Sequence, residues 1–218
     1  MSIERAMVLA AGRGERMRPL TDQVPKPLLT VAGKPLIVYH LEKLSRLGVK
    51  HVVINLAWLG GQIRAALGDG ARWNLQIIYS DEGEQALETG GGILHALPLL
   101  GPQPFLVVNA DVFTEFDFGA VRIAPEALAQ LVLVANPLHH PRGDFALANG
   151  RVQEQGGARW TYSGIGLYRP ELFAGCSPGK FPLLPLLRRA IAGSRLHGQV
   201  FDGAWSDVGS VERLAALQ

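Results

Sequence analysis

Short apolar segments recur through the first two thirds of the chain, and amphipathic stretches separate the earlier ones. The apolar segments are AMVLAA (6–11), HVVIN (51–55), LQIIY (75–79), FLVVN (105–109) and LVLVA (131–135). Near-continuous apolar runs of this length are typical of strands buried on both faces, as in parallel sheets covered by helices. The amphipathic stretches cover 35–48, 58–68 and a segment starting near Glu88. This order predicts an α/β, Rossmann-like doubly wound sheet, mixed but mostly parallel, with right-handed crossovers.

The pattern changes after about residue 136. Asn149-Gly150 lies between alternating residues and predicts a two-residue hairpin turn. SGIGLY (163–168) predicts a further strand, and PLLPLLRRAIAG (182–193) predicts a helix. No linker, internal repeat or low-complexity tract interrupts the chain. We therefore expect a single domain over 1–218, in which a small α+β part from about 136 to 218 packs on the sheet of 1–135.

Composition narrows the class of protein. The 218 residues are 48% hydrophobic, which is enough for a sizeable core. The net charge of +2 argues against a nucleic-acid surface. A lone cysteine, Cys176, fits a reducing compartment, and no apolar run approaches the roughly 20 residues of a membrane span. These features predict a cytoplasmic protein with no nucleic-acid or membrane partner.

Three unusual loops follow predicted strands: residues 12–27, 81–92 and 109–111. Ligands of open parallel sheets bind outside the carboxyl ends of the strands, so the three loops together predict a site at one edge.

The first loop carries glycines and cations. Gly12 and Gly14 let backbone amides approach an anion closely. No Gly-Lys-Ser/Thr follows, so the loop is not a Walker A motif, and Met17 breaks the dinucleotide-binding pattern. Positive charge comes from Arg13, Arg16, Arg18 and Lys26, the last held between Pro25 and Pro27. A solvated basic loop is the alternative interpretation of GRGER.

The other two loops carry glycines and an acid. Three consecutive glycines, Gly90 to Gly92, stand at a predicted helix start, where they cost about 2–3 kcal/mol relative to alanine. Close approach of a ligand would compensate this cost, and a flexible turn is the alternative. Asp111 follows a buried strand, where an aspartate can hold Mg²⁺ or cap a helix. Asp207 in WSDVGS is a second acidic candidate, but the sequence does not bring residues 111 and 207 together.

No covalent nucleophile is evident. The histidines lack metal-binding spacing, and the adjacent His139 and His140 fit a structural or loop role. No serine lies in G-x-S-x-G, and Cys176 has no neighbouring base.

The opening motif resembles that of a known enzyme family. LAAGRGERMRPLT (9–21) followed by PKP (25–27) is similar to the signature of nucleotidyltransferases that form nucleoside-diphosphate sugars and release pyrophosphate. LETGGG, NAD (109–111), GDF (143–145), YSGIGLY and WSDVGS extend the resemblance along the chain. Two departures are Glu88, where most members carry glycine, and Asn109-Ala110-Asp111, where Gly-Asp is usual. The resemblance implies a glycosyltransferase-A-like fold.

The resemblance also implies roles for individual residues. Arg16 and Lys26 would be catalytic: Arg16 would hold the leaving pyrophosphate, and Lys26 would neutralise the attacking and the α-phosphate. Asp111 and Asp207 would hold Mg²⁺, two ions per site. Arg13 and Arg18 would support the loop. The nucleotide would contact Ala11, Gly12, Gly14, Glu82, Thr89 and Gly90, and the sugar would contact Asn109, Gly143, Asp144, Ser163 and Gly164.

Within the family, LETGGG and NPLHHPRGDF (136–145) most resemble members that join UTP to N-acetylmuramic acid 1-phosphate in bacterial cell-wall recycling. The lactyl carboxylate of that sugar would meet His139, His140 or Arg142. The expected partners are UTP and a sugar 1-phosphate, with the chain a monomer or small homo-oligomer. The alternatives are a mannose 1-phosphate guanylyltransferase, a glucose 1-phosphate uridylyl- or thymidylyltransferase, and a non-catalytic nucleotide-sensing relative.

Overall fold

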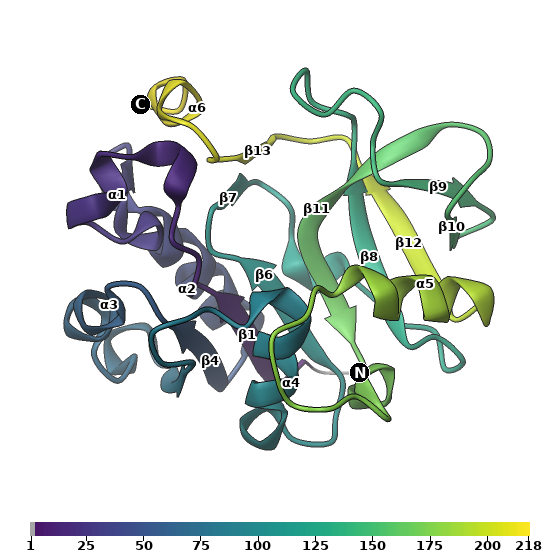
Figure 1. The fold of residues 1–218 in the computed structure, drawn as a ribbon, viewed down its shortest axis with the longest axis horizontal. Helices are drawn as coiled ribbons and strands as arrows, with labels where there is room; N and C mark the ends of the chain where they lie inside the picture. The colour runs from purple at the N-terminus through teal and green to yellow at the C-terminus, as the bar shows by residue number, and fades with distance from the viewer. Residues whose placement is uncertain (1–2) are drawn as a thin grey trace.

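A nine-stranded sheet forms the centre of the computed structural model, which describes residues 3–218 (Figure 1). Its strands lie in the order β5-β4-β1-β6-β11-β8-β12-β10-β9. Their bounds are β1 Arg5–Leu9, β4 His51–Leu56, β5 Gln76–Asp81, β6 Phe105–Asn109, β8 Ala129–Val134, β9 Phe145–Ala148, β10 Arg151–Gln153, β11 Arg159–Tyr168 and β12 Leu196–Phe201. Two small sheets pair β2 (Thr30–Val31) with β3 (Lys34–Pro35) and β7 (Val112–Thr114) with β13 (Trp205–Asp207).

The helices are α1 Leu20–Gln23, α2 Leu36–Leu47, α3 Gly60–Leu67, α4 Glu88–Leu100, α5 Leu184–Ala192 and α6 Val211–Ala215. Helices α2, α3 and α5 lie close to their predicted ranges, and α4 begins at Glu88 as predicted. Short 3₁₀ turns are η1 Glu15–Met17, η2 Lys26–Leu28, η3 Ala71–Trp73, η4 Phe118–Ala120 and η5 Pro170–Phe173. Helix α2 is flanked by Pro35 and by Gly48 in the left-handed region, as its sequence predicts. No helix within residues 3–218 has the length and apolar character needed to span a membrane.

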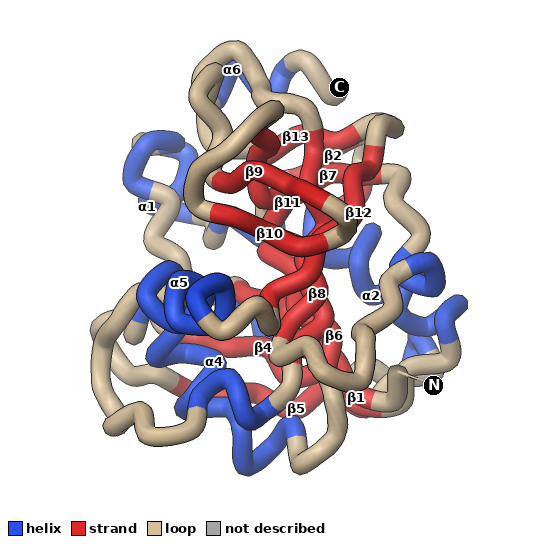
Figure 2. The backbone as a smooth tube through the Cα atoms, turned by 90° about the vertical axis from the view of Figure 1, so that its right-hand side faces the viewer, coloured by secondary structure: helices blue, strands red, loops and turns tan. Residues whose placement is uncertain are grey.

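The apolar strands are buried because helices cover both faces of the sheet (Figure 2). Ala6 and Val8 of β1 face the side packed by α2 and α3, and Met7 faces the side packed by α4 and α5. Strand β1 pairs in parallel with β4 and β6, and β4 pairs in parallel with β5. The predicted doubly wound arrangement is therefore confirmed for this part of the chain.

The later strands extend the same sheet, but not in the order in which they follow one another in the sequence. Strand β11 runs antiparallel between β6 and β8, so β8 is separated from the strands that precede it in the sequence. Asn149 and Gly150 both have positive φ and turn β9 back into β10, which confirms the predicted hairpin. Strands β2, β3, β7 and β12 are additions that the hydrophobic pattern does not predict.

One buried residue of α2 is polar and lacks a partner. His40 is 1% exposed and its ring stacks on Phe118, with centroids 6.1 Å apart. Neither ring nitrogen has a hydrogen-bond partner among residues 3–218. Burial, and then the charge of Lys43, lowers the pKa of His40 from 6.5 to about 4, so this imidazole is neutral in the folded protein at pH 7.

This burial predicts a pH-dependent stability. As the pH falls below about 6.5, His40 becomes protonated in the unfolded chain but stays neutral in the folded chain. This difference lowers the free energy of unfolding by about 2 kcal/mol between pH 7 and pH 5. Urea denaturation at both pH values measures the change. His40→Leu should remove most of this fall, whereas His95→Gln, at an exposed histidine of α4, should keep it. An unchanged fall in His40→Leu would contradict the assignment.

Candidate active site

A cavity of about 480 Å³ opens at the carboxyl ends of β1, β4, β5 and β6. All three sequence-predicted loops contribute to its wall, as expected for the edge of a parallel sheet. The lining residues include Ala11, Gly12, Gly14, Arg16, Lys26, Glu82, Glu88, Thr89, Asn109, Asp111 and Gly209.

The two glycines of the first loop have different reasons for being glycine. Gly14 has φ 69°, and a Cβ there would lie 2.9 Å from Cγ2 of Thr21, whose hydroxyl donates to the Gly14 carbonyl. Gly14 is therefore required by the turn itself. A Cβ at Gly12 would meet nothing within 4 Å, so its backbone faces open space in the cavity wall. Met17, which breaks the dinucleotide pattern, is fully buried in an apolar cluster with Leu36 and Val208.

The three arginines of this loop divide into two groups. Arg13 and Arg18 both pair with Asp22, each at 2.9 Å, and the Arg13 guanidinium stacks 3.5 Å from the Trp58 ring centroid. These two side chains hold the loop in shape. Arg16 is exposed, lines the cavity, and has no acceptor among residues 3–218. Its charge is available to an anion.

Lys26 and Asp111 form an ion pair in the cavity wall. The Lys26 side chain, only 11% exposed, extends from η2, and its ammonium contacts Oδ2 of Asp111 directly after β6. Pro25 and Pro27 restrict the backbone on either side of Lys26. The pair places one cation and one carboxylate at the centre of the predicted site.

The pairing of β7 with β13 shows how Asp111 and Asp207, which the sequence does not bring together, lie relative to each other. In the β7–β13 pairing, Asp207 lies opposite Val112, and the Val208 amide donates to the Asp111 carbonyl at 2.8 Å. The backbones of Asp111 and Asp207 are therefore adjacent, although they come from distant parts of the sequence. Asp111 lines the cavity, whereas Asp207 lies two residues before Gly209, which lines it. No group of three or more His, Cys, Asp or Glu side chains in residues 3–218 forms a metal site, so a metal ion here would rest on these two carboxylates.

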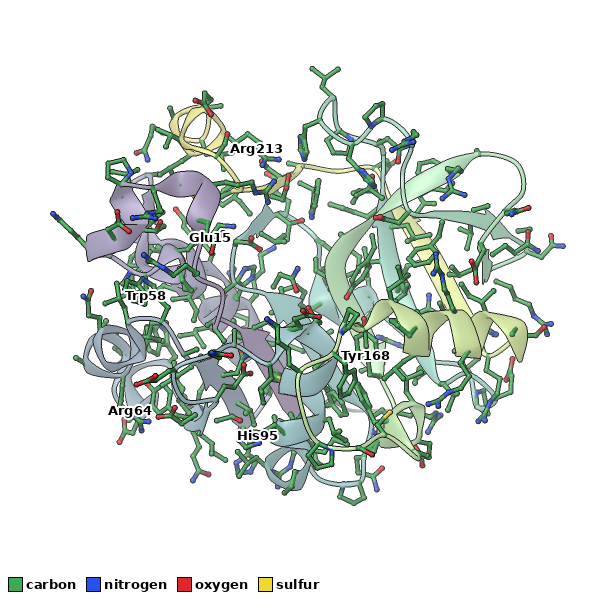
Figure 3. All side chains as sticks on the ribbon, viewed as in Figure 1. Glu15, Trp58, Arg64, His95, Tyr168 and Arg213 are labelled. Atoms are coloured by element: carbon green, nitrogen blue, oxygen red, sulfur yellow. The ribbon has the colours of Figure 1, made fainter. Side chains whose placement is uncertain are left out.

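Asp207 has two partners that the motifs do not single out. Nη1 of Arg213 donates to both carboxylate oxygens, at 2.8 and 2.9 Å, and Nε2 of His139 lies 3.1 Å from Oδ1. Figure 3 shows Arg213 beside β13, under α6. The sequence signal for Arg213 is weak because it lies outside WSDVGS, in a short helix where a basic residue is typical of a solvated surface.

The loop between β5 and α4 is held by a chain of hydrogen bonds. Nδ2 of Asn55 donates to Oε1 of Glu82 at 2.7 Å, and the Leu87 amide donates to Oε2 at 2.6 Å. Oδ1 of the Asn55 side chain accepts from the Ala10 amide at 2.7 Å, which ties this loop to the end of β1. Glu82 lines the cavity and also fixes its wall.

The three glycines of α4 are explained by protein packing, which corrects the interpretation that a ligand compensates them. A Cβ at Gly90 would lie 2.6 Å from the Phe181 ring, and one at Gly92 would lie 2.5 Å from Oε1 of Glu82. The Gly91 amide donates to the Phe181 carbonyl at 3.0 Å. Gly90 is buried under this segment and, unlike Thr89, does not line the cavity. Packing alone thus accounts for Gly90, and its contact with the nucleotide stays a prediction.

Among the predicted sugar contacts, only Asn109 lines the cavity. A Cβ at Gly164, which has φ 79°, would lie 2.7 Å from Nδ2 of Asn109, so Gly164 lets that side chain pack. The Ser163 hydroxyl is buried and donates to the Val132 carbonyl at 2.7 Å. Ser163 and Gly164 therefore lie behind the residues that line the cavity.

Gly143 and Asp144 lie on a separate segment. Gly143 packs against Asn136 in a left-handed turn, where a Cβ would overlap the amide. Asp144 accepts from the Tyr162 amide at 2.8 Å and lies 3.0 Å from Nε2 of His140. These contacts shape the 136–144 loop, whose His139 reaches Asp207.

Sequence and structure comparisons agree on the family. The model of the nucleotidyl transferase family matches residues 5–145. The chain is 53% identical to the N-acetylmuramate alpha-1-phosphate uridylyltransferase of Neisseria meningitidis serogroup B, over 98% of this chain and 96% of that protein. It is 40% identical to the protein of the same name from Caulobacter vibrioides, over 97% and 94%.

A solved structure of a further nucleotidyltransferase has a similar fold. A crystal structure described as a putative glucose-1-phosphate thymidylyltransferase from Bacillus anthracis superposes with a TM-score of 0.85 and 19% identity, covering 98% of this chain and 93% of that one. The Rossmann-like α/β sheet, the glycine loop at its edge and the matched segment give one conclusion. This chain belongs to the nucleotidyl transferase family.

Proposed function

We propose that the chain transfers the uridylyl group of UTP to N-acetylmuramic acid 1-phosphate, with release of pyrophosphate, in bacterial cell-wall recycling. The observation that carries the proposal is the end-to-end match to two relatives of that name, at 53% and 40% identity. The cavity supports it, because its wall combines an open glycine loop, Arg16 with no acceptor among residues 3–218, and Lys26 paired with Asp111.

The chemistry requires two anions to meet. A phosphate oxygen of the sugar 1-phosphate attacks the α-phosphorus of UTP. The bond from that phosphorus to the oxygen bridging the α- and β-phosphates breaks, and this oxygen leaves as a terminal oxygen of pyrophosphate. The attacking phosphate is ionised at neutral pH, so no general base is needed. Positioning and charge neutralisation must carry the rate enhancement, because like charges repel most strongly where they react.

The residues divide this work by position. Lys26, held at the centre of the wall, would neutralise the attacking phosphate and the α-phosphate together. Arg16, with no acceptor among residues 3–218, would hold the departing β- and γ-phosphates. The Gly12 backbone, which faces open space, would allow the nucleotide to approach closely.

Asp111 and Asp207 fit a divalent cation. Mg²⁺ is usually held by one or two carboxylates and completed by substrate phosphates and water, which is the donor set that these neighbouring aspartates offer. When bound, Mg²⁺ would stabilise the negative charge that develops on the phosphates.

The lactyl carboxylate of the sugar needs a cation. His139 and His140 already face Asp207 and Asp144, respectively. Arg142, on the same loop, has no acidic partner among residues 3–218 and is our candidate for this contact.

Substrate preference is the direct test. We expect kcat/KM for UTP with N-acetylmuramic acid 1-phosphate to exceed that for GTP with mannose 1-phosphate, and for UTP or dTTP with glucose 1-phosphate, by about tenfold or more. A coupled assay of pyrophosphate release measures all pairs. Preference for a different pair would refute the substrate, and tight UTP binding without turnover would identify a nucleotide-sensing protein instead.

Lys26 should be essential for turnover. Removing one preorganised charge from a phosphoryl-transfer site costs about 10²–10³ in rate, so Lys26→Ala should lower kcat by at least about 100-fold with an unchanged circular dichroism spectrum. Lys34→Ala is the matched control, because Lys34 pairs with Glu42 outside the cavity. Activity of Lys26→Ala within about threefold of the parent would make the mechanism wrong.

The carboxylates should confer metal dependence. Excess chelator should abolish turnover, and added Mg²⁺ should restore it. Asp111→Asn and Asp207→Asn should each weaken Mn²⁺ binding, followed by electron paramagnetic resonance, by about tenfold or more. Asp117→Asn, which removes only a turn-capping carboxylate, should leave Mn²⁺ binding unchanged. Full activity in chelator would rule out the metal role.

A further inference from the structure

Arg213 uses the oxygens that a divalent cation would use. A single nitrogen, Nη1, donates to both oxygens of Asp207, and the Arg213 side chain is only 20% exposed. The lone pairs that accept these hydrogen bonds are those that coordinate Mg²⁺. The guanidinium and a metal ion are therefore alternative partners of Asp207.

Arg213 also lies beside the free arginine of the cavity. A Cβ built on buried Gly209 would lie 3.1 Å from Nη2 of Arg16 and would overlap Nη2 of Arg213. Gly209 lines the cavity, so both guanidiniums converge on one position of its wall. Two cations at this separation repel each other unless they share an anion. A polyanion that carries charge on adjacent phosphates fits such a pair.

The backbone of Arg213 is held in place, and its long side chain can reach more than one partner. The Ser210 hydroxyl accepts from the Arg213 amide at the start of α6. Leu214 and Leu217 pack on the apolar cluster of Met17, Leu36 and Val208, which holds α6 against η1. Figure 1 shows α6 above the segment that carries η1 and α1. The long side chain can therefore change partner without movement of the helix.

We propose that Arg213 is an exchangeable cation of the active site. It neutralises Asp207 until a divalent cation takes these oxygens, and its guanidinium then joins Arg16 on the two terminal phosphates of the nucleoside triphosphate. This inference rests on the proposed function only in requiring that the cavity bind a triphosphate and a divalent cation. It does not depend on the sugar or the base.

The first experiment measures competition with the metal. Mn²⁺ is titrated into the protein without nucleotide and followed by electron paramagnetic resonance. A partly exposed ion pair is worth up to about 1 kcal/mol, so Arg213→Gln should bind Mn²⁺ about fivefold more tightly than the parent. Arg213→Lys, which keeps the charge, should show a smaller gain. Arg46→Gln, at an exposed arginine of α2, is the matched control and should show no change.

The second experiment measures the phosphate contact. Pyrophosphate and UMP are titrated in buffer with Mg²⁺ by calorimetry. The Arg213→Gln variant loses a charge-assisted hydrogen bond, so its affinity for pyrophosphate should be about tenfold lower than that of the parent. Its affinity for UMP, which lacks the terminal phosphates, should be unchanged. Gly209→Ala should also weaken pyrophosphate binding, because its Cβ separates the two guanidiniums.

The outcomes separate this role from a structural one. If Arg213 only anchored α6, Arg213→Gln would lower the melting temperature and leave Mn²⁺ affinity unchanged or weaker, which would overturn the proposal. Unchanged pyrophosphate affinity would overturn it as well. Because neither probe contains a sugar or a base, a failure of the substrate assignment would leave both measurements readable. Arg213→Lys keeps the test available if Arg213→Gln does not fold.

Discussion

The pairing of β7 with β13 is the constraint on which the candidate site depends. This short antiparallel ladder brings Asp207 beside Asp111 at the edge of the sheet. Each carboxylate is compensated by its own cation, Lys26 for Asp111 and Arg213 for Asp207. The cations in turn come from the first loop and from α6, so the ladder organises charges from four separate parts of the chain.

The sequence is informative wherever local pattern and position are enough. The buried strands read as apolar runs because both of their faces pack against helices, and Asn149-Gly150 marks its hairpin because both residues adopt positive φ. The three loops could be assigned to one site because the carboxyl ends of parallel strands meet at one edge. These inferences need only the neighbouring residues and a general rule of topology.

The inferences that depend on tertiary contacts could not be drawn from sequence. The three glycines of α4 suggest a ligand, but Gly179 and Phe181 fill the space at Gly90 and Gly91, and Glu82 fills it at Gly92. Ser163 and Gly143 look like exposed contacts within motifs, yet one is buried in a strand and the other packs on Asn136. Arg213 was missed for the opposite reason, since its importance comes only from lying next to Asp207.

Glu88 shows that backbone strain and chemistry meet at the cavity. It has φ 60°, a conformation that favours glycine, and it lies at the first position of α4 in the cavity wall. Among residues 3–218, the other non-glycine residues with positive φ are Ala32, Leu59, Asn74, Asn149 and Ser194, and none of them lines this cavity. A strained residue persists where the surrounding structure fixes it, and such positions gather at functional sites.

The ladder between β7 and β13 also has a consequence for the order of folding. The parallel pairings of β1 with β4 and β6, and of β4 with β5, need no residue beyond Asn109. Asp207 and Arg213 are added only after the long return through β11, β8 and β12. Non-local pairings of this kind form late because loop closure opposes them. A growing chain therefore holds the parallel strands that carry the first loop well before it holds both Asp111 and Asp207.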